Sequence, residues 1–367
     1  MEILIPGLSD VTRALLSILC ICLTLVWGIF KWQRRHTERL ASKFPGPTAL
    51  PIVGNALTLL IRTQYDLLWI ITGLCEKYGS PCKFWLGTNR NNSTSSVYSL
   101  ILVEKWKKTR KILTPSFSPK NITRFVPVMN ERATIIIQKM RQHCGSGIEV
   151  DFYPYFFTAS FDTLCGELLI LSNETTAQTN CFVLLMLAIH PEYQEKVFEE
   201  QYNIFGDADR SITPDDLDKM EYLEQAIKET LRLFPVVPIF VRHAEEDTKL
   251  TQNYVLPAGA TAVIFPFFTH YDTELWPEPN KFNPDNFTAE KMANRHKYAF
   301  IPFSGGARGC IGNKYSMMAM KTTLSIFVRQ FRVSTTKKLE DIEVYVDVVL
   351  RCKGGWSMKL EQRINQK

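Results

Sequence analysis

The pattern of hydrophobic and polar positions predicts helices over most of the chain. Between residues 240 and 290, β-branched runs broken by proline, glycine and asparagine predict short strands and loops instead, and the tail after residue 331 again favours strands. Elsewhere, apolar residues recur at helical spacing in the ranges 63–78, 102–115, 124–143, 155–203, 215–234 and 310–331. The fold class expected is therefore mainly α with a smaller β portion.

The N-terminal region has a different pattern. Residues 14–30 carry no charge, and this run is near the lower length limit for a helix that crosses a bilayer. A basic flank, residues 31–39, follows and favours a cytosolic position for the rest of the chain. A cleaved signal peptide is the alternative, but no small-x-small cleavage site follows the run. We expect a membrane anchor with its basic flank at 1–36, a proline-rich linker at 37–55 and one folded domain at 56–367.

Composition and charge narrow the class of protein. The 367 residues are 46% hydrophobic, which is enough for a large core, and the net charge of +6 is spread along the chain. Because there is no block of Lys and Arg, we expect no nucleic-acid partner. The nine cysteines contain no CxxC pair and no cluster with His at zinc spacing, so neither a disulfide framework nor a zinc site is expected.

One cysteine stands in an unusual context. Residues 303–312, FSGGARGCIG, form a glycine-rich segment that delivers Cys310 to the start of an apolar helix. Free backbone amides and the positive end of the helix dipole favour a thiolate there. Glycines let the backbone pass close to a flat macrocycle and let amides point at the sulfur. A buried free thiol is the alternative and is the commoner role of a single cysteine.

This segment resembles the haem-binding signature of the cytochrome P-450 family, at Phe303, Gly306, Arg308, Cys310 and Gly312. The resemblance implies that Cys310 is the axial ligand of a haem b iron, that Arg308 pairs with a haem propionate and that Phe303 shields the sulfur. Thiolate ligation favours cleavage of the O–O bond. It also implies the cytochrome P-450 fold, in an incomplete form, behind an N-terminal transmembrane helix.

A second segment of this family resemblance is the pair Glu229 and Arg232 in KETLRLFP. Their spacing puts an acid and a guanidinium on one helix face, and the resemblance implies the ExxR ion pair that clamps the core behind the haem. The family usually adds an arginine from a nearby segment, but residues 284–287 supply Asn286 at that place. An asparagine can hydrogen-bond but carries no charge. We therefore expect the hydrogen-bond network around Glu229 and Arg232 to be weaker here than in the family, or to be connected differently.

Three more residues resemble the family's propionate contacts: Trp106 and Arg110 in a WxxxR pattern, and Arg242 after the segment PVVP. The alternatives are a core tryptophan and two solvated arginines.

On the distal side, residues 173–176 resemble the acid–threonine pair that relays protons beside the iron. Glu174 and Thr175 are the candidates. Just before them the family has small residues, whereas this chain has Leu171 and Ser172, and a leucine there would crowd the oxygen site. The leucine also rules out an ester between haem and a glutamate at that position.

The segment ETTAQTNCFVLLMLAIHPEYQEKV most resembles the family-4 branch, especially its insect members. Better-known relatives in that branch oxidise fatty acids and similar chains near their ends. The chain looks internally shortened, with abrupt joins within GTNRNNSTSSVYSLILVEKW and near residues 163–167, where substrate-pocket helices should come. A splice form, an incomplete gene model and a degenerate copy remain open as causes.

The resemblance implies a monooxygenase that inserts one atom of O2 into an apolar substrate: a fatty acid, a lipid-like molecule or a xenobiotic. Electrons would come from NADPH through the flavins of NADPH-cytochrome P-450 reductase, with cytochrome b5 as a second partner. The protein would lie in the endoplasmic reticulum membrane, with a single membrane span and its haem domain on the cytosolic side. One alternative is a non-catalytic or vestigial haem-binding protein. Another is a thiol hydrolase using Cys310, although neither His243 nor His270 sits in a nucleophile–base signature.

Overall fold

The computed structural model describes residues 10–50, 53–57, 67–85, 106–162 and 170–363. Packing divides the chain into two units. Unit 1 comprises residues 1–60, 71–92 and 241–262, and unit 2 comprises residues 61–70, 93–240 and 263–367. The residues at both predicted joins, 86–105 and 163–169, lie outside the described part.

Unit 1 contains the long helix α1 (Asp10–Ala41). Within the described residues, one helix, from residue 14 to residue 41, is apolar and long enough to cross a membrane, and its apolar window is not covered by protein. The helix continues past residue 36, where the linker was expected to begin, because neither proline nor glycine occurs between residue 36 and Pro45. Residues 45–49 then have no regular secondary structure.

The rest of unit 1 is small. It includes the part of α3 (Leu67–Tyr78) from residue 71 onward. Within the range 240–264, β2 (Phe240–His243) pairs with β5 (Thr261–Ile264), and β3 (Thr248–Lys249) pairs with β4 (Val255–Leu256). His36 Nε2 lies 2.7 Å from an oxygen of Asp247, which attaches the end of α1 to this β region.

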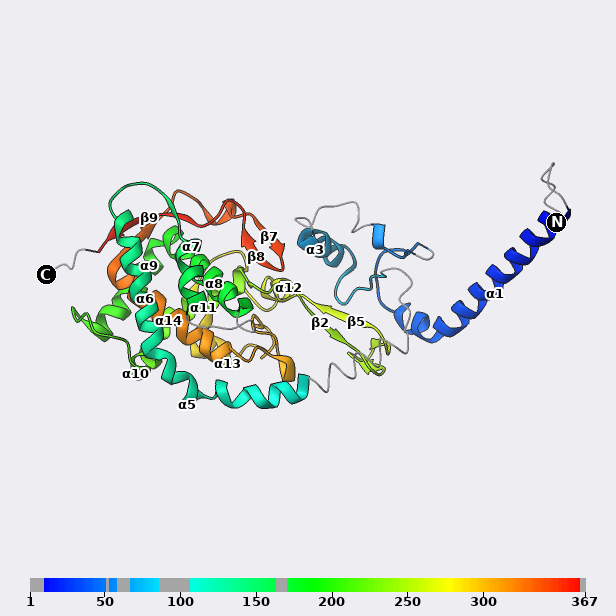
Figure 1. Cartoon of the computed structure of the whole chain (residues 1–367), viewed down its shortest axis with the longest axis horizontal. Helices are drawn as coiled ribbons and strands as arrows, with labels where there is room; N and C mark the ends of the chain where they lie inside the picture. Colours follow the sequence, from blue (N-terminus) through cyan, green and yellow to red (C-terminus); the bar gives the residue numbers. More distant parts are fainter. Residues whose placement is uncertain (1–9, 51–52, 58–66, 86–105, 163–169, 364–367) are drawn as a thin grey trace. The chain divides into compact units, whose positions relative to one another are not determined.

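Unit 2 is built around the helix α8 (Ile170–Ile189), whose residues 177–187 are buried on all sides. A helix that is apolar on every face belongs inside a core, and Figure 1 shows α8 surrounded by other helices. These helices are α6 (Val126–Met140), α7 (Tyr153–Asp162), α9 (Pro191–Phe205), α11 (Glu221–Leu233) and α14 (Asn313–Gln330). Shorter helices are α5 (Pro119–Ile122), α10 (Pro214–Lys219), α12 (Pro266–His270) and α13 (Ala289–Ala293).

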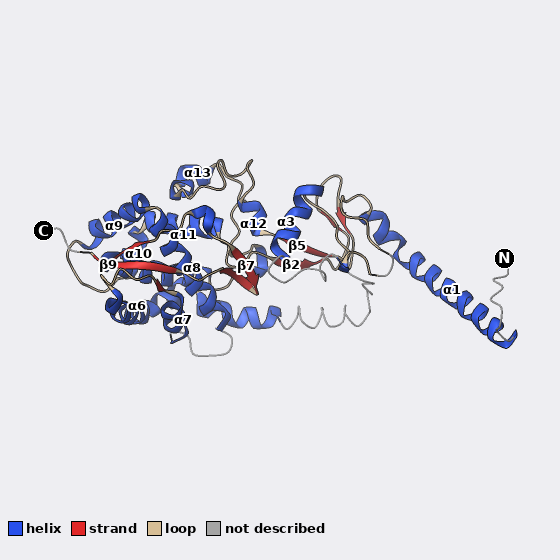
Figure 2. Ribbon diagram, turned by 90° about the horizontal axis from the view of Figure 1, so that it is seen from above, coloured by secondary structure: helices blue, strands red, loops and turns tan. Residues whose placement is uncertain are grey.

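Two small antiparallel sheets complete unit 2 (Figure 2). In one, β9 (Ser357–Gln362) lies between β1 (Val150–Asp151) and β6 (Phe331–Ser334), with Val150 opposite Met358 and Phe331 opposite Gln362. The other is the hairpin of β7 (Val344–Asp347) and β8 (Val349–Cys352). The described residues therefore confirm a mainly helical fold with small sheets.

Two predicted helix boundaries were wrong. The range 155–203 is not continuous: Pro191 begins a new helix, α9, after His190 leaves the helical conformation at φ −120°. The helix expected to begin at Cys310 begins at Asn313, with Gly312 as its N-cap. Cys310 therefore precedes the helix, in a position where the first free amides of α14 can reach its sulfur.

Candidate functional site

The segment 303–312 is a closed loop in front of α14. The amide of Cys310 donates a hydrogen bond to the carbonyl of Phe303 (2.9 Å), and the amide of Gly309 donates to the carbonyl of Gly306 (3.0 Å). Gly306 has φ +69°, a conformation that glycine adopts without strain. These bonds fix the position of Cys310 relative to the helix.

The thiol of Cys310 is exposed, yet amides are directed at it. Desolvation by the surrounding protein raises the pKa of Cys310, while hydrogen bonds from the amides of Gly312 and Asn313 and the charge of Arg110 lower it. Amides that point at sulfur stabilise a thiolate and still leave its outer face open to a ligand. A single thiolate with an open outer face would suit an iron ion whose remaining ligands come largely from a macrocycle.

Two predicted residues of the WxxxR pattern contact this loop. Residues 106–113 are helical, and the guanidinium carbon of Arg308 lies 3.6 Å from the centroid of the Trp106 ring, a cation–π contact. Nη1 of Arg110 donates to the carbonyl of Gly309 (2.9 Å). The structure thus brings Trp106, Arg110, Arg308 and Cys310 together from distant parts of the sequence.

Behind the loop, Glu229 and Arg232 form a bidentate ion pair. Nε and Nη2 of Arg232 each lie 2.8 Å from a carboxylate oxygen of Glu229, and both side chains are 0% exposed. Arg232 also donates to the carbonyls of His270, Pro279 and Lys281 at 2.7–2.9 Å. The guanidinium therefore ties α11 to the segment that follows α12.

Asn286 does form the hydrogen bond that its chemistry allows. Its Nδ2 donates to Glu229 (3.1 Å), and the amide of Asn283 donates to the same carboxylate oxygen (2.9 Å). Burial raises the pKa of Glu229, and the charge of Arg232 opposes this rise. The carboxylate thus has four donors from three residues, although residue 286 supplies no charge.

Two residues that the sequence interpretation did not assign to the site are His270 and Arg295. Nε2 of His270 accepts from the amide of Ile301 (2.9 Å), while its carbonyl accepts from Arg232. Nη1 of Arg295 donates to the carbonyl of Asn286 (2.8 Å), and its guanidinium carbon lies 3.8 Å from the Trp276 ring centroid. Their sequence signal was weak, since a lone His and a lone Arg before the cysteine loop match no short motif.

The proposed distal residues lie on α8. Glu174 forms an ion pair with Arg351 of β8 and accepts a hydrogen bond from Gln178 (3.2 Å). Thr175 is half-buried beside it, and its carbonyl accepts from Thr179 (2.8 Å). The side chains of Leu171 and Ser172 lie outside the described residues, so the expected crowding of the oxygen site remains a prediction.

Arg242 belongs to unit 1, where its Nη1 donates to the carbonyl of Val241 (2.9 Å). Its contact with a propionate likewise remains a prediction.

Known proteins share these segments. A family model described as "Cytochrome P450" matches residues 91–169 and 162–355. The chain is 43% identical over 193 residues to "Cytochrome P450 4g1" of Drosophila melanogaster, covering 52% of this chain and 35% of the relative. It is 42% identical over 191 residues to "Cytochrome P450 4V2" of Homo sapiens, covering 52% of this chain and 36% of the relative. In these two comparisons the match spans only about a third of the relative.

A longer alignment explains this short coverage. "Cytochrome P450 4c3" of Drosophila melanogaster aligns at 25% identity over 519 positions, with 98% of this chain and 96% of the relative. Because 519 positions exceed the 367 residues of this chain, the relative contains internal segments without a counterpart here. The internally shortened, family-4-like pattern expected from the sequence is thereby confirmed.

Proposed function

Because the chain belongs to the cytochrome P450 family, we propose that it is a haem-thiolate monooxygenase that inserts one atom of O2 into an apolar substrate. The observation that supports this most is the exposed Cys310 thiol, towards which the amides of Gly312 and Asn313 are directed. When haem is bound, it supplies the activation of oxygen, and a thiolate on the iron favours that chemistry. Fatty acids and lipid-like molecules are the substrate class suggested by the resemblance to family-4 members.

Each residue near the loop has a role in this proposal. Cys310 would hold the iron, and Phe303 would cover the sulfur. Arg308 and Arg110 would meet the propionates, since a guanidinium has several donors and the one contact of Arg110 with Gly309 uses only one nitrogen. Trp106 keeps Arg308 in place through the cation–π contact.

Glu174 and Thr175 are the proposed proton-handling residues. Arg351 and Gln178 both donate hydrogen bonds to the carboxylate of Glu174, and these contacts fix its direction. We propose that Glu174 and the hydroxyl of Thr175 relay protons to the oxygen site.

The electrons would come from NADPH through NADPH-cytochrome P-450 reductase, with cytochrome b5 as a second donor. In this proposal α1 anchors the chain in the endoplasmic reticulum membrane and keeps the remainder on the cytosolic side. Its apolar side chains, such as Val26 (64% exposed) and Ile29 (57% exposed), have no protein cover. Lipid is the environment that accommodates such a helix.

A second candidate function is a haem-binding protein without turnover. It is favoured by the internal segments that the longer relative has and this chain lacks. Turnover separates the two candidates: the full chain is reconstituted with the reductase and given dodecanoic acid under O2. Hydroxylated product formed in proportion to NADPH consumed supports the enzyme, whereas haem binding without product supports the non-catalytic protein.

A further inference from the structure

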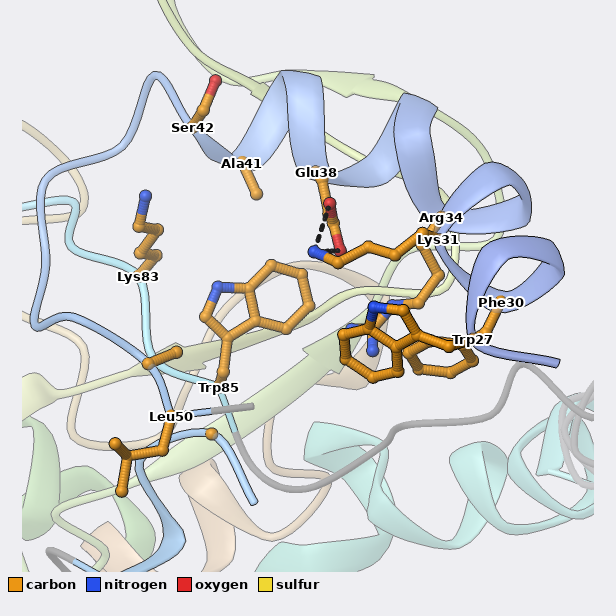
Figure 3. Close-up of a pocket in the computed structure, with 12 residues that line it drawn as sticks. Trp27, Phe30, Lys31, Arg34, Glu38, Ala41, Ser42, Leu50, Lys83 and Trp85 are labelled. Carbon is orange, nitrogen blue, oxygen red and sulfur yellow. Dashed lines mark hydrogen bonds and ion pairs between the residues drawn. The ribbon is translucent and has the colours of Figure 1, made fainter. Parts of the chain in front are cut away.

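Unit 1 contains a pocket of about 320 Å³ at the end of the apolar part of α1 (Figure 3). It is lined by aromatic side chains from Trp27, Phe30 and Trp85 and by cationic side chains from Lys31, Arg34 and Lys83. Aromatic rings and cations together characterise the level at which a membrane-spanning helix leaves the hydrocarbon and meets the headgroups. None of the residues assigned above to the oxygen chemistry lines this pocket.

The wall opposite α1 is held by the proline-rich segment. The amide of Asn55 donates to the carbonyl of Trp85 (2.6 Å), and Oδ1 of Asn55 accepts from the amide of Trp85 (3.1 Å). Gly54 has φ +61°, and a Cβ there would lie 2.5 Å from the Trp85 carbonyl oxygen. Any larger residue at position 54 would push Trp85 away, so the close approach depends on glycine. The backbone that carries the indole is therefore fixed in place.

The charges in the pocket are unbalanced. Lys31 pairs with Glu38 at 3.2 Å. The guanidinium carbon of Arg34 lies 4.9 Å from the ring centroids of both Phe30 and Trp85. Neither Arg34 nor Lys83 has an acidic partner among the residues that the structure describes. Arg34 is oriented by its two rings and lines a pocket with excess positive charge.

We propose that this pocket binds the phosphate of an anionic phospholipid headgroup, an inference that rests on the membrane anchor in the proposed function. Guanidinium and ammonium groups are the preferred partners of phosphate. Each basic residue near an anionic bilayer surface adds to binding. The acyl chains of such a lipid would lie along the exposed apolar face of α1. The pocket thus sets the depth and rotation of the anchor.

The test uses the full chain purified in a neutral detergent and offered equal amounts of phosphatidylserine and phosphatidylcholine. Native mass spectrometry measures which lipid is retained. Arg34→Gln and Lys83→Gln should each lower retained phosphatidylserine roughly five-fold, while Arg34→Lys should keep most of it. Arg35→Gln is the matched control, because Arg35 carries the same charge on the same helix but does not line the pocket.

Equal retention of the two lipids, or an equal loss in Arg35→Gln, would overturn the proposal. Displacement of phosphatidylserine by millimolar inorganic phosphate would also overturn it, because the site would then recognise a free anion. Extraction of membranes with alkaline carbonate checks the anchor separately. Release of the chain by carbonate would refute the anchor, whereas an integrated chain without lipid preference would refute only the pocket.

Discussion

The imidazole of His270 accepts a hydrogen bond from the amide of Ile301 at 2.9 Å. The carbonyl of the same residue accepts from Arg232 (2.9 Å), and the carbonyl of Ile301 accepts from the amide of Ser304 (3.0 Å). His270 therefore joins the buried ion pair on α11 to the loop that carries Cys310. This connection makes His270 a positioning residue for the loop.

Replacement of His270 by alanine should destabilise the protein and loosen the loop. The change leaves the half-buried amide of Ile301 without its acceptor, which costs about 1 kcal/mol, the lower end of the range for a fully buried donor. Urea unfolding of the wild type and of His270→Ala measures the difference in their free energies of unfolding. His296→Ala is the control, because His296 is exposed and its imidazole accepts from the amide of Tyr298 at 3.3 Å. Equal unfolding midpoints for all three proteins would show that the connection contributes nothing.

Lowering the pH should reduce the free energy of unfolding, partly because of His270. Burial lowers the pKa of this residue from 6.5 to about 3, so the folded state keeps it neutral while the unfolded state gains a proton below pH 6.5. The stability that the neutral, buried His270 contributes is complete above pH 6.5, and it falls by about 1.4 kcal/mol per pH unit towards pH 3. Unfolding of wild type and His270→Gln between pH 6.5 and pH 5 measures it. Parallel pH profiles would contradict the assignment.

Removal of the Glu229 carboxylate should have the largest effect on folding. Glu229→Gln leaves the guanidinium of Arg232 buried and uncompensated, a change that typically costs 3–5 kcal/mol, and both side chains are fully buried here. Loss of soluble, haem-binding protein is the expected result. Glu343→Gln is the control: its carboxylate pairs with Lys353 at the surface, where both side chains are about two-thirds exposed, and such pairs contribute at most about 1 kcal/mol. Similar yields for both variants would refute the structural role of Glu229.

The pair of Glu174 and Arg351 provides a test of the distal side. Glu174→Gln should lower product formation by about a hundred-fold or more, because general acid–base groups typically contribute 10²–10⁴-fold, and should leave the haem spectrum unchanged. Arg351→Gln removes the partner but retains the carboxylate, so product formation should fall less than in Glu174→Gln. Unchanged turnover in Glu174→Gln would exclude Glu174 from proton transfer.

The sequence identified the site better than it identified the helix boundaries. The cysteine loop and the Glu229–Arg232 pair were predictable because each has a dense local motif. The break at Pro191 follows from the proline itself, which a reading of periodicity alone overlooked. The start of α14 at Asn313 depends on the backbone hydrogen bonds of the preceding loop, which periodicity does not report. His270 and Arg295 were missed because their partners, Ile301 and Asn286, are contacted through backbone groups that leave no side-chain signature.

The ligation of iron by Cys310 is the central claim, and one spectrum tests it. The purified full chain is reduced, exposed to CO and compared with Cys310→Ala and with Cys144→Ala, whose half-buried thiol lies outside the loop. We expect a Soret band at the long wavelength typical of thiolate ligation in wild type and Cys144→Ala, and its loss in Cys310→Ala. The same band in Cys310→Ala, or no haem uptake by the wild-type chain, would contradict the assignment.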